Sequence, residues 1–303
     1  MRSRSKIETS GFSDLYPFTS HFFERNVLKY HFIDEGTGDP IVMPHGNPTW
    51  SFYFRTLVKE FSSEYRTIAP DHIGCGLSDK PDSKLYDYRL KSRVDDIEAL
   101  LAFLGISEKI TLVLHDWGGM IGMAYAVRYP ESIQRLVVMN AAAFLPPPGK
   151  RIPIRLQIIR NYRLFAKITV LGFNLFAYSA LFMASRKGLS REVKSGLIAP
   201  YNCWKNRIAL LKFVQDIPLD ENDPSYHLVK ETDENLNQFS NISMLICWGK
   251  RDFVFDTEYL DEWKRRFPKA EVHCYPEAGH YVLEDVPDKI VSHIHDFLKR
   301  HPL

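Results

Sequence analysis

The chain has 303 residues, of which 45% are hydrophobic and 25% charged, proportions typical of a globular protein. Its 39 basic and 37 acidic side chains leave a net charge of +2, which excludes the strongly basic surface that nucleic-acid binding needs. The four cysteines are far apart and include no C-x-x-C pair, so we expect neither a disulfide framework nor a metal site. This cysteine usage is typical of a cytoplasmic protein, which is the location we expect.

The first residues are basic, with Arg2, Arg4 and Lys6, and polar residues follow them. A secretory signal needs an apolar segment directly after its basic residues. The sequence therefore predicts no such signal.

Short β-branched and aliphatic runs alternate with helical patterns through most of the chain, which predicts an α/β fold with a mostly parallel sheet. Apolar residues at helical spacing predict a helix over 90–104, which Gly105 ends, and further helices over 120–128 and 288–299. We expect strands at 27–33, 40–43, 65–69, 109–114, 135–139, 243–248 and 271–275.

The strand pattern disappears between Asn140 and Asp223, where aromatic and aliphatic helical stretches take its place. We therefore expect a helical cap at 144–222, inserted between a first part of the core at 1–143 and a second part at 223–303. Inside the cap, residues 168–184 are apolar and close to the shortest length that spans a bilayer. Their composition favours a buried or groove-lining helix over surface contact with a membrane.

A carboxylate follows the apolar run 110–114, in the sequence His115-Asp116-Trp117-Gly118-Gly119, and a helical pattern follows it. A strand, a sharp turn and a helix, with the reactive group at the turn, form a nucleophile elbow. An Asp could simply cap the helix, but the Trp-Gly-Gly that follows favours a catalytic role. A carboxylate at this turn can displace a leaving group from carbon and form an ester with the substrate.

Two further residues follow predicted strands and complete a catalytic triad. His280 lies in a glycine-flanked loop after the last strand, where a base that activates water is expected. Asp252 follows the strand before it and fits the acid that orients the imidazole, with Asp256 as a weaker candidate. The order nucleophile, acid, histidine is that of the α/β-hydrolases.

The segment His45-Gly46-Asn47-Pro48 supplies the remaining candidate group. We expect the backbone N–H groups of Asn47 and Trp117 to face a developing oxyanion. Their side chains are also hydrogen-bond donors, which suits a leaving anion such as a halide or a carboxylate.

These motifs together resemble the haloalkane dehalogenases, in the subgroup with an Asp-His-Asp triad and an Asn-Trp pair. The resemblance is carried by HGNPTWSF at 45–52, DHIGCGLSDKP at 71–81, HDWGGMIG at 115–122, WGKRDFVFD at 248–256 and AGHYVLED at 278–285. It implies an α/β-hydrolase fold with eight strands and helices on both faces. It also implies a cofactor-free dehalogenase in which Asp116 is the nucleophile, His280 the base and Asp252 the acid. Asn47 and Trp117 would hold the halide.

Other activities remain open at this point. The same motifs, and the cap segments 200–208 and 214–219, resemble β-lactone decarboxylases of olefin biosynthesis, so the substrate is a small apolar haloalkane or a β-lactone. An epoxide hydrolase would use cap tyrosines such as Tyr162, Tyr178 or Tyr201 as acids, but Asn47 disfavours it. A binding scaffold without activity is disfavoured because all triad residues are in place. The sequence leaves self-association open.

Overall fold

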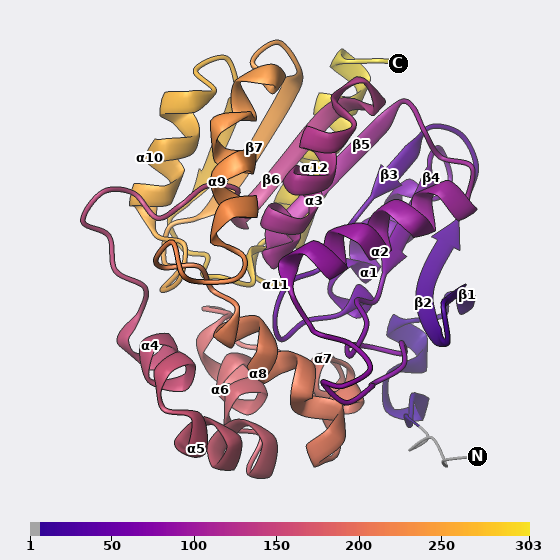
Figure 1. The fold of residues 1–303 in the computed structure, drawn as a ribbon. Coiled ribbons are helices and arrows are strands. Elements are labelled where there is room, and N and C mark those ends of the chain that lie inside the picture. The colour runs from indigo at the N-terminus through magenta and orange to yellow at the C-terminus, as the bar shows by residue number, and fades with distance from the viewer. Residues whose placement is uncertain (1–6) are drawn as a thin grey trace.

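The computed structural model describes residues 7–303, and the N-terminal basic residues at 2, 4 and 6 lie outside that range. Within it, eight strands form one sheet in the order β1-β2-β4-β3-β5-β6-β7-β8 (Figure 1). The first two pairs, β1 with β2 and β2 with β4, are antiparallel, and all the others are parallel. The strands are β1 His21–Arg25, β2 Leu28–Glu35, β3 Pro40–Val42, β4 Arg66–Pro70, β5 Ile110–Asp116, β6 Ile133–Ala141, β7 Ser243–Gly249 and β8 Glu271–Tyr275.

The predicted α/β-hydrolase fold with an eight-stranded, mostly parallel sheet is confirmed. The central strand β5 is buried along its whole length, as expected of a parallel strand covered on both faces. Strand β1 was not predicted, because it lies at the edge of the sheet and its sequence HFFER has no continuous apolar run.

Helices cover both faces of the sheet. The apolar side chains of α2, α3 and α10 belong to one core cluster, and those of α1 and α12 belong to a second cluster on the opposite face. The core helices are α1 Arg55–Phe61, α2 Leu90–Phe103, α3 Trp117–Arg128, α9 Tyr226–Glu234, α10 Thr257–Arg266, α11 Val282–Asp285 and α12 Pro287–Arg300. Short 3-10 helices are η1 Ser10–Leu15, η2 Ser51–Phe54, η3 Pro130–Ser132 and η7 Leu236–Phe239.

Between β6 and β7 the chain forms only helices, which lie beyond the carboxyl ends of the parallel strands (Figure 1). They pack around a small apolar cluster of their own, which includes Ala166, Val170 and Ala177. The interval contains α4 Ile154–Asn161, α5 Arg163–Ala166, π-helix η4 Lys167–Gly172, α6 Leu175–Met183, α7 Arg191–Ile198, η5 Ala199–Tyr201, η6 Trp204–Arg207 and α8 Ile208–Gln215. These helices occupy the interval expected for the cap, whose limits at 144 and 222 stay a prediction.

The apolar stretch 168–184 forms two segments rather than the single helix that the sequence predicts, but side chains from both segments line a cavity between the cap and the sheet, as the groove-lining interpretation expects. Asn174 adopts a left-handed conformation with φ 55°, which ends the first segment and starts α6 in a new direction. Each segment buries one side in the cap and leaves the other exposed. Within residues 7–303 no single helix has the length and apolarity to cross a membrane. The pair Arg163–Gly172 and Leu175–Met183, bent by 71°, meets those criteria jointly.

Candidate active site

The nucleophile elbow predicted from the sequence is present where β5 meets α3. Asp116 is the last residue of β5 and has φ 51° and ψ −128°, a conformation that places its side chain outside the regular strand. Its carboxylate does not cap α3. It instead accepts a hydrogen bond of 2.7 Å from the backbone N–H of Asn47. Asp116 therefore occupies the N-cap position of α3, but its side chain makes no capping hydrogen bond.

The glycines after Asp116 allow the close packing of the elbow. A Cβ at Gly118 would collide with the backbone carbonyl of Pro44, and a Cβ at Gly119 would lie 2.7 Å from the Cβ of Ala141. Larger residues would push α3 away from the sheet and displace the carboxylate.

Burial dominates the electrostatics of the nucleophile. It raises the pKa of Asp116 to about 6, an effect to which Asp252 adds, although His280 and the backbone N–H groups of Asn47 and Trp117 act in the opposite direction. A carboxylate with few water molecules around it is a stronger nucleophile than a solvated one. At neutral pH it is still ionised and able to attack.

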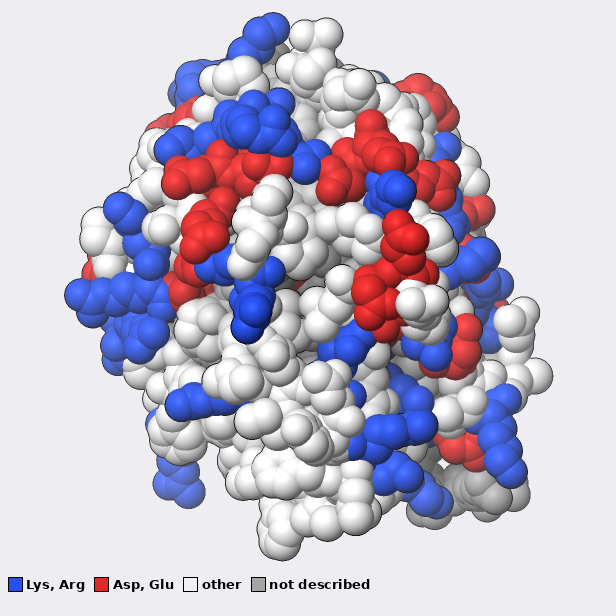
Figure 2. Space-filling model, turned by 60° about the vertical axis from the view of Figure 1, so that its left-hand side comes forward, with Lys and Arg blue, Asp and Glu red and all other residues white. Residues whose placement is uncertain are grey.

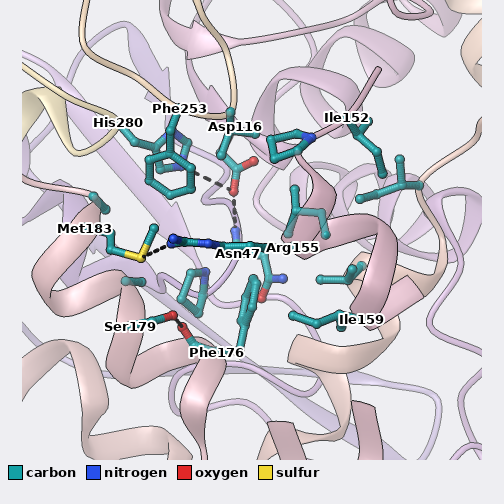
Figure 3. Close-up of a pocket in the computed structure, with 18 of the residues that line it drawn as sticks. Asn47, Asp116, Ile152, Arg155, Ile159, Phe176, Ser179, Met183, Phe253 and His280 are labelled. Carbon is teal, nitrogen blue, oxygen red and sulfur yellow. Dashed lines mark hydrogen bonds and ion pairs between the residues drawn. The ribbon is translucent and has the colours of Figure 1, made fainter. Parts of the chain in front are cut away.

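His280 lies beside the nucleophile (Figure 3), and Asp252 is hydrogen-bonded to its imidazole, as the sequence predicts. The Nδ1 atom of His280 is 2.8 Å from Oδ2 of Asp252, and its Nε2 atom is 4.0 Å from Oδ2 of Asp116. Burial lowers the pKa of His280, but the two carboxylates outweigh it and leave that pKa above its usual value. Asp256, the weaker candidate, caps α10 instead through a hydrogen bond from the N–H of Glu258.

Asn140 is a part of the site that sequence reasoning missed. It lies near the end of β6, and its amide donates to Oδ2 of Asp252 and to the carbonyl of Gly249, both at 3.0 Å. Its amide oxygen accepts from the N–H of Gly249 at 2.8 Å. Asn140 therefore holds the acid at a fixed position relative to β7. Its place at the C-terminal end of a parallel strand was the available signal.

Of the two side-chain donors in the predicted Asn-Trp pair, one is already hydrogen-bonded within the protein. The side-chain amide of Asn47 donates to the carbonyl of Leu210 in α8, at 3.1 Å, so the cap holds it. The indole of Trp117 packs on Phe213 and, in the part of the chain that the structure describes, its N–H has no hydrogen-bond partner. The guanidinium of Arg93 lies 3.6 Å above the Phe213 ring and supports this stack from behind.

A cavity of about 600 Å³ lies between the sheet and the cap and contains the nucleophile at one end. Its lining is mainly aliphatic and aromatic, with side chains from α4, η4 and α6. Arg155, Asp116 and His280 are the ionisable exceptions besides the tyrosines, and Arg155 donates to the sulfur of Met183 (Figure 3). Such a cavity selects an apolar substrate with one polar reacting group.

The cap tyrosines do not form a pair of acids above the nucleophile. Of the three candidates, Tyr178 lines the cavity, Tyr162 does not, and the hydroxyl of Tyr201 donates to the carbonyl of Thr49. This arrangement does not support the epoxide hydrolase hypothesis.

The sequence of this chain matches a known protein family. Residues 39–287 match the family model described as the alpha/beta hydrolase fold. The chain is an α/β-hydrolase. Its fold is also similar to that of the solved haloalkane dehalogenase from Agrobacterium tumefaciens, with a TM-score of 0.85, 23% identity, and coverage of 96% of this chain and 99% of that one.

Sequence relatives distinguish between the activities that share this fold. A cis-3-alkyl-4-alkyloxetan-2-one decarboxylase from Shewanella oneidensis is 50% identical over 94% of this chain and 89% of its own length. One from Xanthomonas campestris is 42% identical over 95% of this chain and 98% of its own. A haloalkane dehalogenase from Mycolicibacterium paratuberculosis is only 29% identical, over 92% of both chains.

These identities overturn the dehalogenase activity that the motifs suggested first. The motifs contain the nucleophile, the acid and the histidine and resemble both groups, so they report the elbow and the triad rather than the substrate. Identity over the whole chain also counts the cap, which forms most of the cavity wall. The chain is an enzyme of the α/β-hydrolase family. Its sequence identity to the two decarboxylases, 50% and 42%, is much higher than its 29% identity to the dehalogenase.

Proposed function

We propose that this enzyme is a β-lactone decarboxylase, which converts a four-membered lactone with two alkyl substituents into an alkene and carbon dioxide. The observation that carries the proposal is the 50% identity to the Shewanella oneidensis decarboxylase over nearly the whole chain. The apolar cavity supports it, because an oxetan-2-one with two alkyl chains has a single polar group to place beside Asp116.

The first step uses the carboxylate of Asp116 as a nucleophile. It attacks the ring carbon that bears the ring oxygen, and the bond between that carbon and the ring oxygen breaks. The electron pair of this bond remains on the oxygen, so the ring opens to a free carboxylate while an ester forms on Asp116. Relief of strain in the four-membered ring favours this step, and no proton is transferred.

The second step returns the enzyme to its starting state. The bond between the substrate carboxylate and its neighbouring carbon breaks, and its electron pair forms the carbon–carbon double bond. The ester oxygen leaves at the same time as the carboxylate of Asp116, and carbon dioxide departs. Atoms and charge balance without water, a metal or a redox cofactor.

The groups around Asp116 suit the charge that moves in these steps. The backbone N–H of Asn47 donates a hydrogen bond of 2.7 Å to the attacking carboxylate, and it can form that bond again when the ester breaks and the carboxylate is released. The free indole N–H of Trp117 is available to the carboxylate that the substrate releases. His280, whose Nε2 atom is 4.0 Å from Asp116 and whose pKa is raised by Asp252 and Asp116, is a group at the same end of the cavity that can carry positive charge.

The test is to incubate the protein with a cis-dialkyl oxetan-2-one and measure alkene and carbon dioxide. We expect both in equal amounts, and neither with Asp116→Asn. In water labelled with heavy oxygen, Asp116 gains no label during turnover, since its ester is never hydrolysed. Formation of a hydroxy acid in place of the alkene, or label in Asp116, would contradict the proposal.

A further inference from the structure

The outer face of the cap exposes a group of large apolar side chains, which we call the cap patch: Leu164, Phe165, Ile168, Phe173, Leu175 and Phe182. The most exposed are Leu164 at 74%, Phe182 at 70% and Phe173 at 67%. Scattered exposed apolar residues are ordinary, but a contiguous group on one face marks an interaction surface. Helix α6 has no charged residue, so solvent is an unfavourable environment for its outer side.

The surroundings of the cap patch are basic. From residue 151 to 191 the chain contains no Asp or Glu, but it contains eight basic residues: Arg151, Arg155, Arg160, Arg163, Lys167, Arg186, Lys187 and Arg191. Figure 2 shows the cap at the bottom as mostly uncharged, with basic side chains along its borders and acidic side chains gathered on the core above. This asymmetry arises in a chain whose net charge is only +2.

A second stretch of the cap adds to this basic border. Trp204, which is 47% exposed, lies beside Gly172, and Arg207 donates to the carbonyls of Leu171 and Gly172. Lys212 lies close enough to Arg89 and Arg163 for these charges to lower its pKa, after burial as the first cause. Tryptophan and basic residues around an apolar face are the composition of segments that lie in the interface of a bilayer.

We propose that the cap patch docks on the surface of an anionic lipid bilayer. The apolar side chains would enter the outer part of one leaflet, and Arg163, Lys167 and their basic neighbours would contact the headgroups. The segment cannot cross the bilayer, because the inner sides of η4 and α6 are buried in the cap through Val170 and Ala177. A second copy of the chain fits this face less well, since face-to-face pairing would bring two basic borders together.

The cap patch is also continuous with the active-site cavity. Phe165, Leu175 and Phe182 line that cavity and are each more than half exposed. If the proposed function holds, a lactone with long alkyl chains can pass from the lipid to Asp116 without crossing water. Docking itself does not depend on that function.

The experiment is sedimentation of the full-length protein with vesicles of phosphatidylcholine mixed with phosphatidylglycerol, and with vesicles of phosphatidylcholine alone. We expect binding to the mixed vesicles that is at least about tenfold stronger, and that falls as salt is raised. The double variant Leu164→Ser with Phe173→Ser should lose binding. Neither residue lines the cavity, so its turnover of a short, water-soluble β-lactone should be unchanged.

Two matched controls separate the cap patch from general effects. The double variant Val27→Ser with Leu85→Ser removes two exposed apolar side chains from the surface of the hydrolase domain, outside the cap, and should leave vesicle binding intact. Arg163→Glu with Lys167→Glu should weaken binding by about tenfold or more, whereas Lys59→Glu with Lys299→Glu, which makes the same change of charge elsewhere, should weaken it far less.

Three results would overturn the proposal. One is the absence of binding to mixed vesicles, and another is equal binding by the wild-type protein and the Leu164/Phe173 variant. The third is a dimer in solution that fails to bind vesicles and becomes a monomer in that variant, which would assign the patch to a second copy. Loss of decarboxylation with intact vesicle binding would instead count against the proposed function alone.

Discussion

Replacing the nucleophile with its neutral analogue, Asp116→Asn, should make the protein more stable as well as inactive. Burial raises the pKa of Asp116 from 3.8 to about 6. Each pKa unit corresponds to about 1.4 kcal/mol, so the folded state holds the ionised carboxyl at a cost of about 3 kcal/mol above pH 6. Asparagine has the shape of aspartate, so it meets the same backbone strain at φ 51° and ψ −128°, and its amide oxygen can still accept from the N–H of Asn47.

The gain should be about 1–3 kcal/mol at neutral and higher pH; the upper value is the cost of ionising the buried carboxyl, which already includes the attraction between Asp116 and His280. The sign follows from protonation. The unfolded carboxyl ionises above 3.8 and the folded one above about 6, so the difference between variant and wild type shrinks as pH falls through this interval and vanishes below it. For a chain of this length, the unfolding midpoint should rise by roughly 2–5 °C.

The assay is urea unfolding followed by tryptophan fluorescence, in parallel for wild type and variant across this pH range. An exposed carboxyl, changed as Asp14→Asn, serves as the control and should leave stability unaltered at every pH. A variant that is no more stable than wild type at high pH would refute the idea that burial of the charge is costly here.

Three further predictions concern activity. The kcat/KM should fall as pH drops below about 6, because Asp116 becomes protonated. A pH–rate profile tests this, and an unchanged rate at lower pH would contradict it. Gly46→Ala should reduce turnover by on the order of a hundredfold, since the new Cβ would collide with Asp116, whereas Gly172→Ala has its nearest neighbour at 3.7 Å and should be neutral in the same assay. Asn140→Gly should lower kcat by about tenfold with little change in KM and should shift the pH profile, because Asp252 loses a hydrogen bond; an unshifted profile would leave Asn140 with a purely structural role.

The sequence predicted the core of the fold well because its strands are continuous apolar runs, as in β5, and its elbow has a distinctive Asp-Trp-Gly-Gly pattern. The triad could be anticipated because each member follows a strand of a parallel sheet, so their side chains meet at one edge. The structure brings Asp116, His280 and Asp252 together as expected.

Other features depend on three-dimensional contacts that local sequence does not encode. The kink at Asn174 comes from one residue in a left-handed conformation, and the apolar pattern on both sides of it is unbroken. The hydrogen bond from Asn47 to Leu210 joins residues separated by 163 positions. The substrate was misjudged because it is set by the cap and the cavity wall, whereas the recognisable motifs surround the nucleophile.

The backbone and side-chain amides of Asn47 connect the cap to the nucleophile by two hydrogen bonds. Its backbone N–H bonds to Asp116, and its side chain bonds to the carbonyl of Leu210 in α8. A displacement of α8, whether by a bulky substrate or by contacts on the outside of the cap, should therefore act on the reacting carboxylate through Asn47 and on the neighbouring Trp117 through Phe213. Distant substitutions in α8 that shift its axis should tune reactivity without altering a single atom of the triad.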